Sequence, residues 1–248
     1  MMTNWKAGLI HFGISLPVVA IAALAMTLVW FPPPLFQAAG GSHLILILTG
    51  VDITIGPFLT LLVYKAGKRS LKFDLAVIGL IQVGALLYGA HTIFLARPAY
   101  VVFVVNQFEV VTSADIPPEE QSKAQTPEFR HSPLGRFRLV AARLPVSIDE
   151  QQRILFASIA GHDLSHFPQH YVSYDSQMKT VAVRAEPMQS LKQLNPGREQ
   201  QIENWIAKNG KTAATARFLP VKAIRQDFAA LIDADTGQLL DFASFTPW

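Results

Sequence analysis

Three histidines, His162, His166 and His170, are spaced four residues apart, which could place three imidazoles on one helix face as metal ligands. Gly161 and Pro168 would interrupt that helix, and no carboxylate there completes a recognised zinc motif. Histidine patterns of this kind often arise by chance. We therefore expect a loop with ordinary surface histidines and no bound metal.

A second set of candidate ligands, Asp233, Asp235 and Asp241, surrounds an Asp-x-Asp-x-Gly sequence. This sequence has the beginning of a calcium loop but lacks its distal glutamate and its other ligands. Aspartate and glycine are also common turn residues, because they tolerate the backbone angles of tight turns. We therefore expect a turn between two strands.

Motifs of the common catalytic and cofactor sites are absent from the sequence. It contains no Gly-x-Ser-x-Gly, no glycine-rich phosphate loop and no His-Glu-x-x-His. The lack of cysteine excludes disulfides, thiolate zinc sites, iron–sulfur clusters and cysteine nucleophiles. The sequence therefore predicts neither an enzyme nor a cofactor.

Three long apolar segments dominate the N-terminal part of the chain, and only Asp52 and Asp74 interrupt them. The segments are 9–30, 44–64 and 73–95. At 1.5 Å per residue each is about 30 Å long or slightly more, which matches the hydrocarbon core of a bilayer. The first segment is too long for a signal-peptide core and has no clean cleavage site after it, so we expect it to be retained.

The fold class that follows is a membrane α-helical domain of three transmembrane helices, followed by an α+β extracytoplasmic domain. The expected boundaries are 1–97 for the membrane domain and 98–248 for the outer domain.

Positive charge gives the expected orientation in the membrane. Residues 1–97 hold six of the 21 Lys and Arg and two of the 18 acidic residues, and four of those six lie within 65–72. By the positive-inside rule that connection is cytoplasmic. Three spans then place the N-terminus in the cytoplasm and the outer domain in the periplasm of a Gram-negative cell. The net charge of +3 is therefore a topology signal and predicts no nucleic-acid partner.

Asp52 is the most informative residue inside these segments. It lies eight residues into the second one, about 12 Å deep by helix rise. A carboxylate at that depth costs several kcal/mol unless it is neutral, paired or facing protein, so it is a functional hypothesis by default. The alternatives are that it reaches the periplasmic headgroups or pairs with His91 or Thr54. The sequence leaves these alternatives open.

Other residues of the spans have structural interpretations beside functional ones. We expect Asp74 to cap the third helix at the cytoplasmic face, where its charge suits the helix dipole. Pro57 should kink the second span or relax its hydrogen bonding. Small residues give spans two and three faces that either pack within the bundle or receive a foreign helix, and both interpretations stay open. They are Gly50, Gly56, Gly79, Gly84, Gly89, Ala76 and Ala85.

The outer domain shows short elements of both kinds. We expect strands or one long strand over 100–112, an irregular stretch over 116–133, and an extended segment over 216–224 in which Pro220 indicates a sheet edge. Helices are expected over 148–159, with a Ser147/Glu150 capping box, and over 198–209. Residues 228–242 have the pattern of a hairpin.

The chain resembles a known family, the type IV pilin accessory proteins (the TfpX/TfpZ group). The resemblance lies in Asp52-Ile-Thr-Ile-Gly-Pro57 and its surroundings, in 71–78, Gln82, 88–89 and 96–100, and in 218–221, 235–237 and 247–248. It is strongest over 52–100 and weak over 117–200. The signature positions are Asp52, Gly56, Pro57, Lys72, Phe73, Asp74, Tyr88, Arg97 and Pro98.

The resemblance implies a non-catalytic, chaperone-like protein of the bacterial inner membrane that assists assembly or surface display of a cognate type IV pilin. Its implied partners are the pilin or prepilin, the lipid bilayer and other pilus-assembly proteins. We hypothesise that spans two and three receive the pilin helix while the outer domain contacts the pilin head. The candidate partner-binding residues are Asp52, Gly56, Pro57, Asp74, Tyr88 and Arg97.

The competing hypothesis is a membrane-anchored periplasmic sensor or ligand-binding protein. It predicts a concave pocket with convergent polar groups within residues 99–248.

Overall fold

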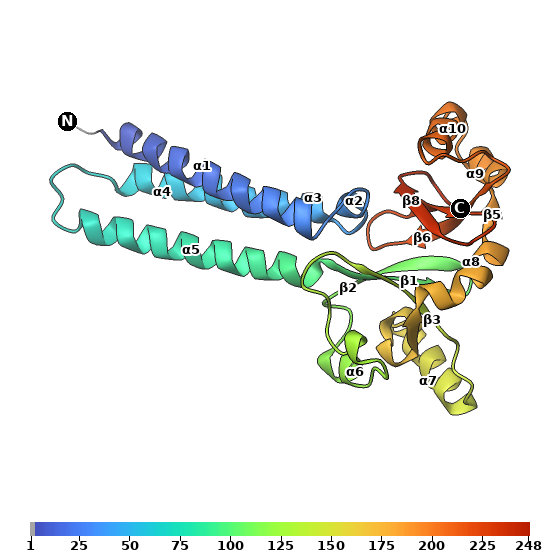
Figure 1. Cartoon of the computed structure of the whole chain (residues 1–248). Helices are drawn as coiled ribbons and strands as arrows, with labels where there is room; N and C mark the ends of the chain where they lie inside the picture. The colour runs from blue at the N-terminus through green and yellow to red at the C-terminus, as the bar shows by residue number, and fades with distance from the viewer. Residues whose placement is uncertain (1–2) are drawn as a thin grey trace. The chain divides into compact units, whose positions relative to one another are not determined.

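The computed structural model describes residues 3–248, and the chain divides into two compact units (Figure 1). The helical unit contains residues 3–30 and 40–96, and the sheet unit contains 31–39 and 97–248. The connection between the first two apolar segments thus belongs to the sheet unit, which the sequence pattern did not indicate. Leu35 and Ala38 of this connection pack in the core of the sheet unit, and the Ala38 carbonyl accepts from the Arg225 amide at 3.0 Å.

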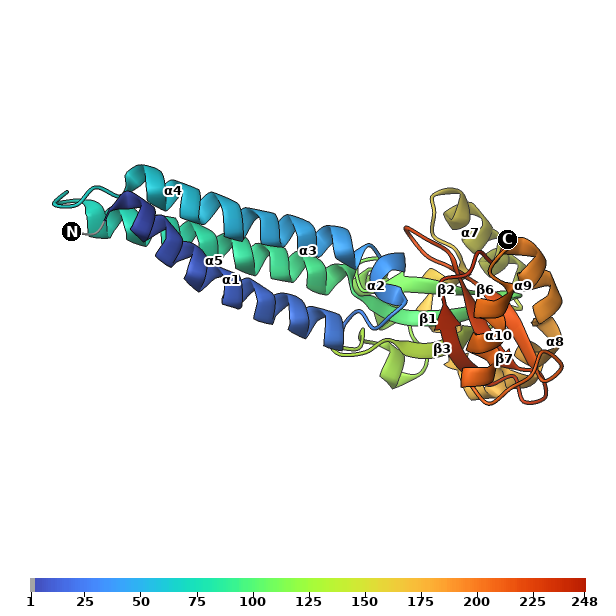
Figure 2. The same ribbon diagram turned by 90° about the horizontal axis from the view of Figure 1, so that it is seen from above.

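The helical unit contains three helices that are long and apolar enough to cross a membrane, as the sequence predicts. Asn4–Val29 (α1) and Leu71–Ala96 (α5) are each continuous, whereas Gly41–Val63 is composed of three elements. These are α3 (Gly41–Gly50), a π-helical turn η1 (Val51–Ile55) and α4 (Gly56–Val63). Figure 2 shows the helices of this unit running side by side.

Local chemistry sets the limits of α1. The Thr3 side chain accepts from the Lys6 amide at 3.4 Å and thereby caps the N-terminus of the helix. Near the other end, Trp30 meets Phe94 of α5 in an edge-to-face contact with ring centroids 5.2 Å apart. Most apolar side chains of these helices point outward, Ile21 and Leu80 among them. Outward-facing apolar side chains are expected of helices whose surroundings are apolar.

The sheet unit is built on a mixed sheet in the order β4-β3-β1-β2-β6-β7-β8, with β5 paired to β6. The strands are β1 (Pro98–Val104), β2 (Gln107–Thr112), β3 (Arg138–Ala142), β4 (Tyr171–Ser173), β5 (Glu186–Pro187), β6 (Ala216–Lys222), β7 (Phe228–Asp233) and β8 (Leu239–Ala243). The α-helices are α2 (Leu35–Ala38), α6 (Pro118–Ser122), α7 (Ile148–Ile159), α8 (Met178–Arg184), α9 (Met188–Leu194) and α10 (Glu199–Lys208). The 3₁₀ turns are η2 (Pro127–Phe129), η3 (Leu164–His166), η4 (Pro168–His170) and η5 (Tyr174–Gln177).

A short parallel pairing between β2 and β6 joins the two halves of this sheet, with the register Phe108↔Val221 and Glu109↔Lys222. One face carries a continuous apolar core across both halves, including Phe103, Phe108 and Phe228. The alternate residues of the strands form two separate cores on the opposite face, one over β1 and β3 and one under α9 and α10. Between these two cores lies the seam where β2 meets β6.

Several expectations for this unit are confirmed. β1 and β2 form an antiparallel pair, β7 and β8 form the hairpin, and α7 and α10 occupy the expected helical segments. The stretch 116–133 is mostly irregular, although it contains the short elements α6 and η2.

The prediction of a capping box at the start of α7 is wrong, because the Ser147 side chain makes no cap hydrogen bond. Glu150 is engaged elsewhere. Its carboxylate accepts from Arg153 Nη2 and Gln169 Nε2, both at 2.7 Å, and lies 3.1 Å from His170 Nε2. The hydrogen bond from Arg153, followed by those from His170 and Gln169, lowers the pKa of Glu150 to about 2.

The edge position expected for Pro220 is also wrong, because β6 has partners on both sides. On one side β6 pairs with β7 along most of its length. On the other side β5 pairs with residues 217–218 and β2 with residues 221–222. Pro220 falls between those two short pairings, so neither β5 nor β2 needs a hydrogen bond from the N–H that proline lacks.

Asp233 organises the turn between β7 and β8. Its Oδ1 accepts from the Asp235 and Thr236 amides at 3.0 and 2.8 Å and from the Thr236 hydroxyl at 2.9 Å. Its Oδ2 pairs with Lys211. Asp241 lies apart and accepts from Trp205 Nε1 at 3.0 Å. The expectation of a turn is therefore confirmed.

Replacing Asp233 with alanine is expected to lower the free energy of unfolding by about 2–3 kcal/mol, because each hydrogen bond to a charged group contributes about 1.5–3 kcal/mol. The hydrogen bond from Lys211, then that from the Thr236 amide, holds the pKa of Asp233 well below its usual range. The stabilisation is therefore present above about pH 4 and is lost as the pH falls through the lowered pKa. Thermal unfolding of the detergent-solubilised chain at several pH values measures it.

Asp235→Ala is the matched control, because Asp235 occupies the same turn with an exposed side chain. Its effect should stay within about 0.5 kcal/mol. Equal losses from both variants would contradict the assignment of the turn to Asp233.

Candidate functional site

The three histidines do not share a helix. His162 follows α7, His166 lies in η3 and His170 in η4, so the expectation of a loop is confirmed. The rings of His162 and His166 meet edge to face at 5.6 Å, while His170 faces Glu150. Within residues 3–248 no three His, Asp or Glu side chains are grouped in a way that could hold a metal ion.

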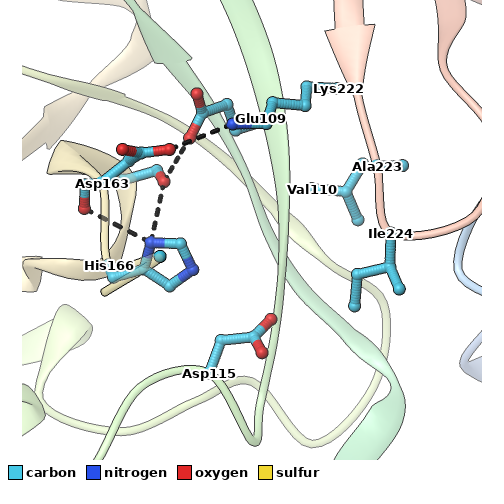
Figure 3. A pocket seen from close by; sticks show the side chains of 10 residues that line it. Glu109, Val110, Asp115, Asp163, His166, Lys222, Ala223 and Ile224 are labelled. Atoms are coloured by element: carbon cyan, nitrogen blue, oxygen red, sulfur yellow. Dashed lines mark hydrogen bonds and ion pairs between the residues drawn. The ribbon is translucent and has the colours of Figure 1, made fainter. Parts of the chain in front are cut away.

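A polar pocket of about 230 Å³ opens at the seam of the sheet unit (Figure 3). Glu109 of β2 is only 7% exposed, and it accepts from Gln107 Nε2 at 2.7 Å and from Ser165 Oγ at 2.5 Å. Lys222 of β6 pairs with Asp163 at 3.0 Å, and this hydrogen bond raises the pKa of Lys222. In Figure 3, Glu109, Asp163 and His166 converge.

This pocket has the concave polar form that the sensor hypothesis predicts. Its principal polar groups are nevertheless occupied by one another, since Glu109 and Lys222 both have protein partners and Asp115 accepts from the Thr112 amide and hydroxyl. Hydrogen bonds and ion pairs of this kind offset the free-energy cost of burying polar atoms where the two halves of the sheet join. The geometry thus favours a structural network at the seam.

Asp52 differs from these groups. It lies in η1, is only 4% exposed, and its Oδ2 has no hydrogen-bond partner among residues 3–248. Of the alternatives left open by the sequence, a pairing with His91 or Thr54 is not found, since both of those side chains are exposed. Burial inside the helical unit argues against the alternative that Asp52 reaches the headgroups. A buried carboxylate oxygen without a donor is costly, which makes Asp52 a candidate for contact with a further group.

The backbone carbonyl of Asp52 in the π-helical turn takes its donor from another helix. In the i→i−5 pattern of a π-helix, position 57 would donate its N–H to the carbonyl of residue 52, and Pro57 has no N–H. The Gln82 side chain of α5 takes that place, because its Nε2 donates to the Asp52 carbonyl at 3.2 Å. The expectation that Pro57 relaxes the local hydrogen bonding is therefore confirmed.

Gly56 is the third part of this arrangement. A Cβ at position 56 would lie 1.8 Å from Gln82 Nε2, so any side chain there would displace the amide. Asp52, Gly56, Pro57 and Gln82 therefore act as one unit, in which the proline removes a donor, the glutamine replaces it and the glycine leaves room for it.

Other polar side chains of the helical unit also face its interior. His11 Nδ1 of α1 lies 2.5 Å from the Thr60 hydroxyl of α4, and this contact joins the two helices. Ser15 of α1 is buried nearby. The sequence did not indicate the interior contacts made by four polar residues, His11, Ser15, Thr60 and Gln82. One available signal was that a proline within a helix requires a replacement donor for a carbonyl one turn earlier.

The small residues divide into two groups. Gly56 and Gly89 are used within the unit, since a Cβ at position 89 would lie 2.4 Å from Leu48 Cδ1. A Cβ at Gly50, Gly79 or Gly84 would meet no atom within 4 Å, apart from its own chain neighbours and helix backbone. The packing interpretation therefore applies to the first group, and the second remains open to a further helix.

Asp52 lies at the base of two grooves. The α1–α5 groove, of about 180 Å³, is bordered by Ser15 and Val18 of α1 and by Gly79 and Val83 of α5. The α3–α5 groove, of about 320 Å³, runs between Leu44–Val51 and Ala85–Ile93. Tyr88 borders the second groove with 74% of its surface exposed.

The remaining candidates lie near the ends of α5. Asp74 does not itself cap the helix; it lies in the first turn, where it pairs with Lys68 at 2.6 Å and accepts from the Ser70 hydroxyl at 3.1 Å. Arg97, which is 1% exposed, donates through Nε and Nη2 to the Pro133 carbonyl at 3.2 and 2.9 Å.

Lys72 and Phe73 are exposed at the start of α5, and Pro98 begins β1.

Gly56→Ala is expected to destabilise the helical unit by about 1–3 kcal/mol, because it displaces Gln82 and leaves the Asp52 carbonyl without a donor. Thermal unfolding in detergent measures this loss. Gly50→Ala is the control, since position 50 lies in the same span with open space around it. A Gly56→Ala/Gln82→Ala double variant should lose no more than Gln82→Ala alone, and additive losses would show that the two residues act separately.

Comparison with known proteins gives consistent matches. The family model of the fimbrial assembly protein FimB matches residues 1–40. The fimbrial assembly proteins of Dichelobacter nodosus serogroups I and E1 are 32% and 31% identical over 219 residues, which cover 87% of this chain and 85% of each relative. The protein of serogroups C1 and C2 is 35% identical over 117 residues, covering 46% of this chain and 89% of that relative.

No solved structure matches the chain. Because relatives more than 30% identical match along most of the sequence, the resemblance found in the sequence is confirmed, and the chain belongs to the fimbrial assembly proteins, a family of type IV pilin accessory proteins.

Proposed function

We propose that this protein is a non-catalytic, chaperone-like protein of the bacterial inner membrane that binds a cognate type IV pilin and thereby assists its assembly or surface display. In this proposal the N-terminus lies in the cytoplasm and the sheet unit in the periplasm. The names of its relatives support a role in fimbrial assembly, and pilin is the pilus component that offers an apolar helix to a membrane partner, as the family resemblance implies.

The observation that carries this proposal is the open face of the helical unit. Its helices are apolar on the outside, yet they keep grooves and open glycine positions that a closed bundle would fill. In lipid, helices associate through close packing at small residues and through interhelical hydrogen bonds. A helix bundle with unfilled small-residue positions is therefore suited to hold another apolar helix.

The division of the chain into units supports the proposed topology. The connection 31–39 belongs to the sheet unit, as does the chain after α5, and neither the connection nor its flank 40–43 carries Lys or Arg. The connection 65–72 carries four basic residues and belongs to the helical unit. The basic connection and the sheet unit therefore belong on opposite sides of the membrane.

Single cysteines test this topology, because the natural chain contains none. Ala66→Cys and Ser176→Cys place thiols at exposed positions of the basic connection and of the sheet unit. A membrane-impermeant maleimide added to cells with a permeabilised outer membrane should label position 176, and label position 66 only after lysis. The reverse labelling pattern would overturn the orientation.

Binding of pilin is tested by crosslinking in piliated cells, followed by purification of the detergent-solubilised full chain. We expect pilin to be recovered with it. Deletion of the gene should remove surface pili while prepilin is still made. Unchanged piliation, or no crosslink to pilin at any position of the chain, would overturn the proposed function.

The seam pocket is the observation that favours the second candidate, a periplasmic ligand-binding protein. Glu109→Gln distinguishes the two functions. If the seam is structural, this variant lowers the thermal stability and leaves the pilin crosslink in place in the protein that folds.

A further inference from the structure

Two observations meet in the α1–α5 groove. The first is an open, mainly apolar space between two helices that both pack on the second span. The second is the Asp52 side chain at its base, which is more than nine-tenths buried and whose Oδ2 lacks a partner within the described chain. A groove alone would indicate no particular occupant, but a carboxylate oxygen without a donor specifies part of the occupant's chemistry.

We propose that the α1–α5 groove binds one apolar transmembrane helix and that Asp52 recognises a hydrogen-bond donor, neutral or cationic, on that helix. This inference rests on the proposed function, in which the occupant is the membrane helix of the pilin. The site lies between the first and third spans with the second span as its floor, whereas the sequence had suggested spans two and three.

The chemistry of the site follows from the low dielectric around it. A carboxylate in an apolar surrounding is stabilised by a donor that satisfies its free oxygen, and an amine, amide or hydroxyl on the incoming helix supplies one. The backbone of Asp52 is held in place by Gln82, so the side chain is positioned before the occupant arrives. Fixed placement of this kind reduces the ordering cost of binding.

The packing of the two grooves favours the α1–α5 groove over the α3–α5 groove. Gly89, the glycine of the α3–α5 groove, is already covered by Leu48. Gly79, the glycine of the α1–α5 groove, has no atom near the position of a Cβ, so a helix backbone can approach there. Ser15 of α1 and Gln82 of α5 border the same groove and add polar groups near Asp52.

A photoreactive benzoylphenylalanine locates the occupant in piliated cells. Val18 and Val83 border the groove with exposed side chains. Leu46 of α3 and Leu62 of α4 are more exposed still but border neither groove. We expect pilin to crosslink at positions 18 and 83 and only weakly at 46 and 62. Crosslinks to a second copy of this chain at positions 18 and 83, or to no protein there, would overturn the groove as the helix site.

Gly79→Leu and Gly84→Leu form a matched pair, because a Cβ meets no atom within 4 Å at either glycine of α5 and only Gly79 borders the groove. Gly79→Leu should reduce the crosslink at position 83 by about tenfold or more, and Gly84→Leu should leave it unchanged. Equal effects of the two variants would overturn the proposal. The thermal stability of both variants in detergent confirms that each remains folded.

Asp52→Asn and Asp52→Leu test the recognition by the carboxylate. The asparagine keeps the shape and one acceptor oxygen, so it should reduce the crosslink several-fold if the donor is cationic and little if the donor is neutral. The leucine should reduce it in both cases. Unchanged crosslinking in Asp52→Leu would overturn the role of Asp52.

Thr54→Val is the control for these variants, since Thr54 is an exposed polar residue of the same π-helical turn that borders neither groove, and it should leave the crosslink intact. If pilin crosslinks only at positions 46 and 62, the groove is wrong and the proposed function stands. If pilin crosslinks at no position, both fail.

Discussion

The hydrogen bond from the Gln82 amide to the Asp52 carbonyl is the interaction on which the helical unit depends. Pro57 cannot supply the N–H that the π-helical pattern requires, and in an apolar surrounding water cannot replace it. The third helix must therefore pack where its amide reaches the second, and Gly56 must leave the space. Asp52 lies in this same turn with its side chain buried, and it borders both grooves.

The seam pocket and the grooves of the helical unit differ in how their polar groups are paired. At the seam of the sheet unit, Glu109 is bonded to Gln107 and Ser165, and Lys222 is paired with Asp163, so this network supports the joint between β2 and β6. In the helical unit the Asp52 carboxylate is buried with one oxygen lacking a donor within the described residues. Satisfied networks rigidify a fold, whereas an unsatisfied group stores free energy that a partner can release. For this reason the helical unit is a better candidate for partner binding than the seam pocket.

Much of the local structure was predictable where interactions between residues close in the sequence dominate. The apolar segments, the helix over 148–159 and the hairpin around Asp233 follow from hydropathy, periodicity and turn chemistry, and they are found where expected. The errors arise where a residue has distant partners. Glu150 is drawn from its cap position by Gln169 and His170, 19 and 20 residues away, as well as by Arg153 of its own helix. Pro220 occupies a gap between two partner strands that are far away in the sequence. The short strands β4 and β5 form only because they pair with β3 and β6, so no local sequence pattern predicted them.

The sequence by itself determined the three apolar segments, the asymmetry of basic charge between their connections and the family to which the chain belongs. These properties depend on composition and on order along the chain, which folding does not alter. Only the tertiary structure decided that residues 31–39 belong to the sheet unit, that Gln82 serves the Asp52 carbonyl, and which glycines are covered and which are open. Each of these depends on contacts between residues distant in sequence, and a linear pattern carries no record of which faces meet.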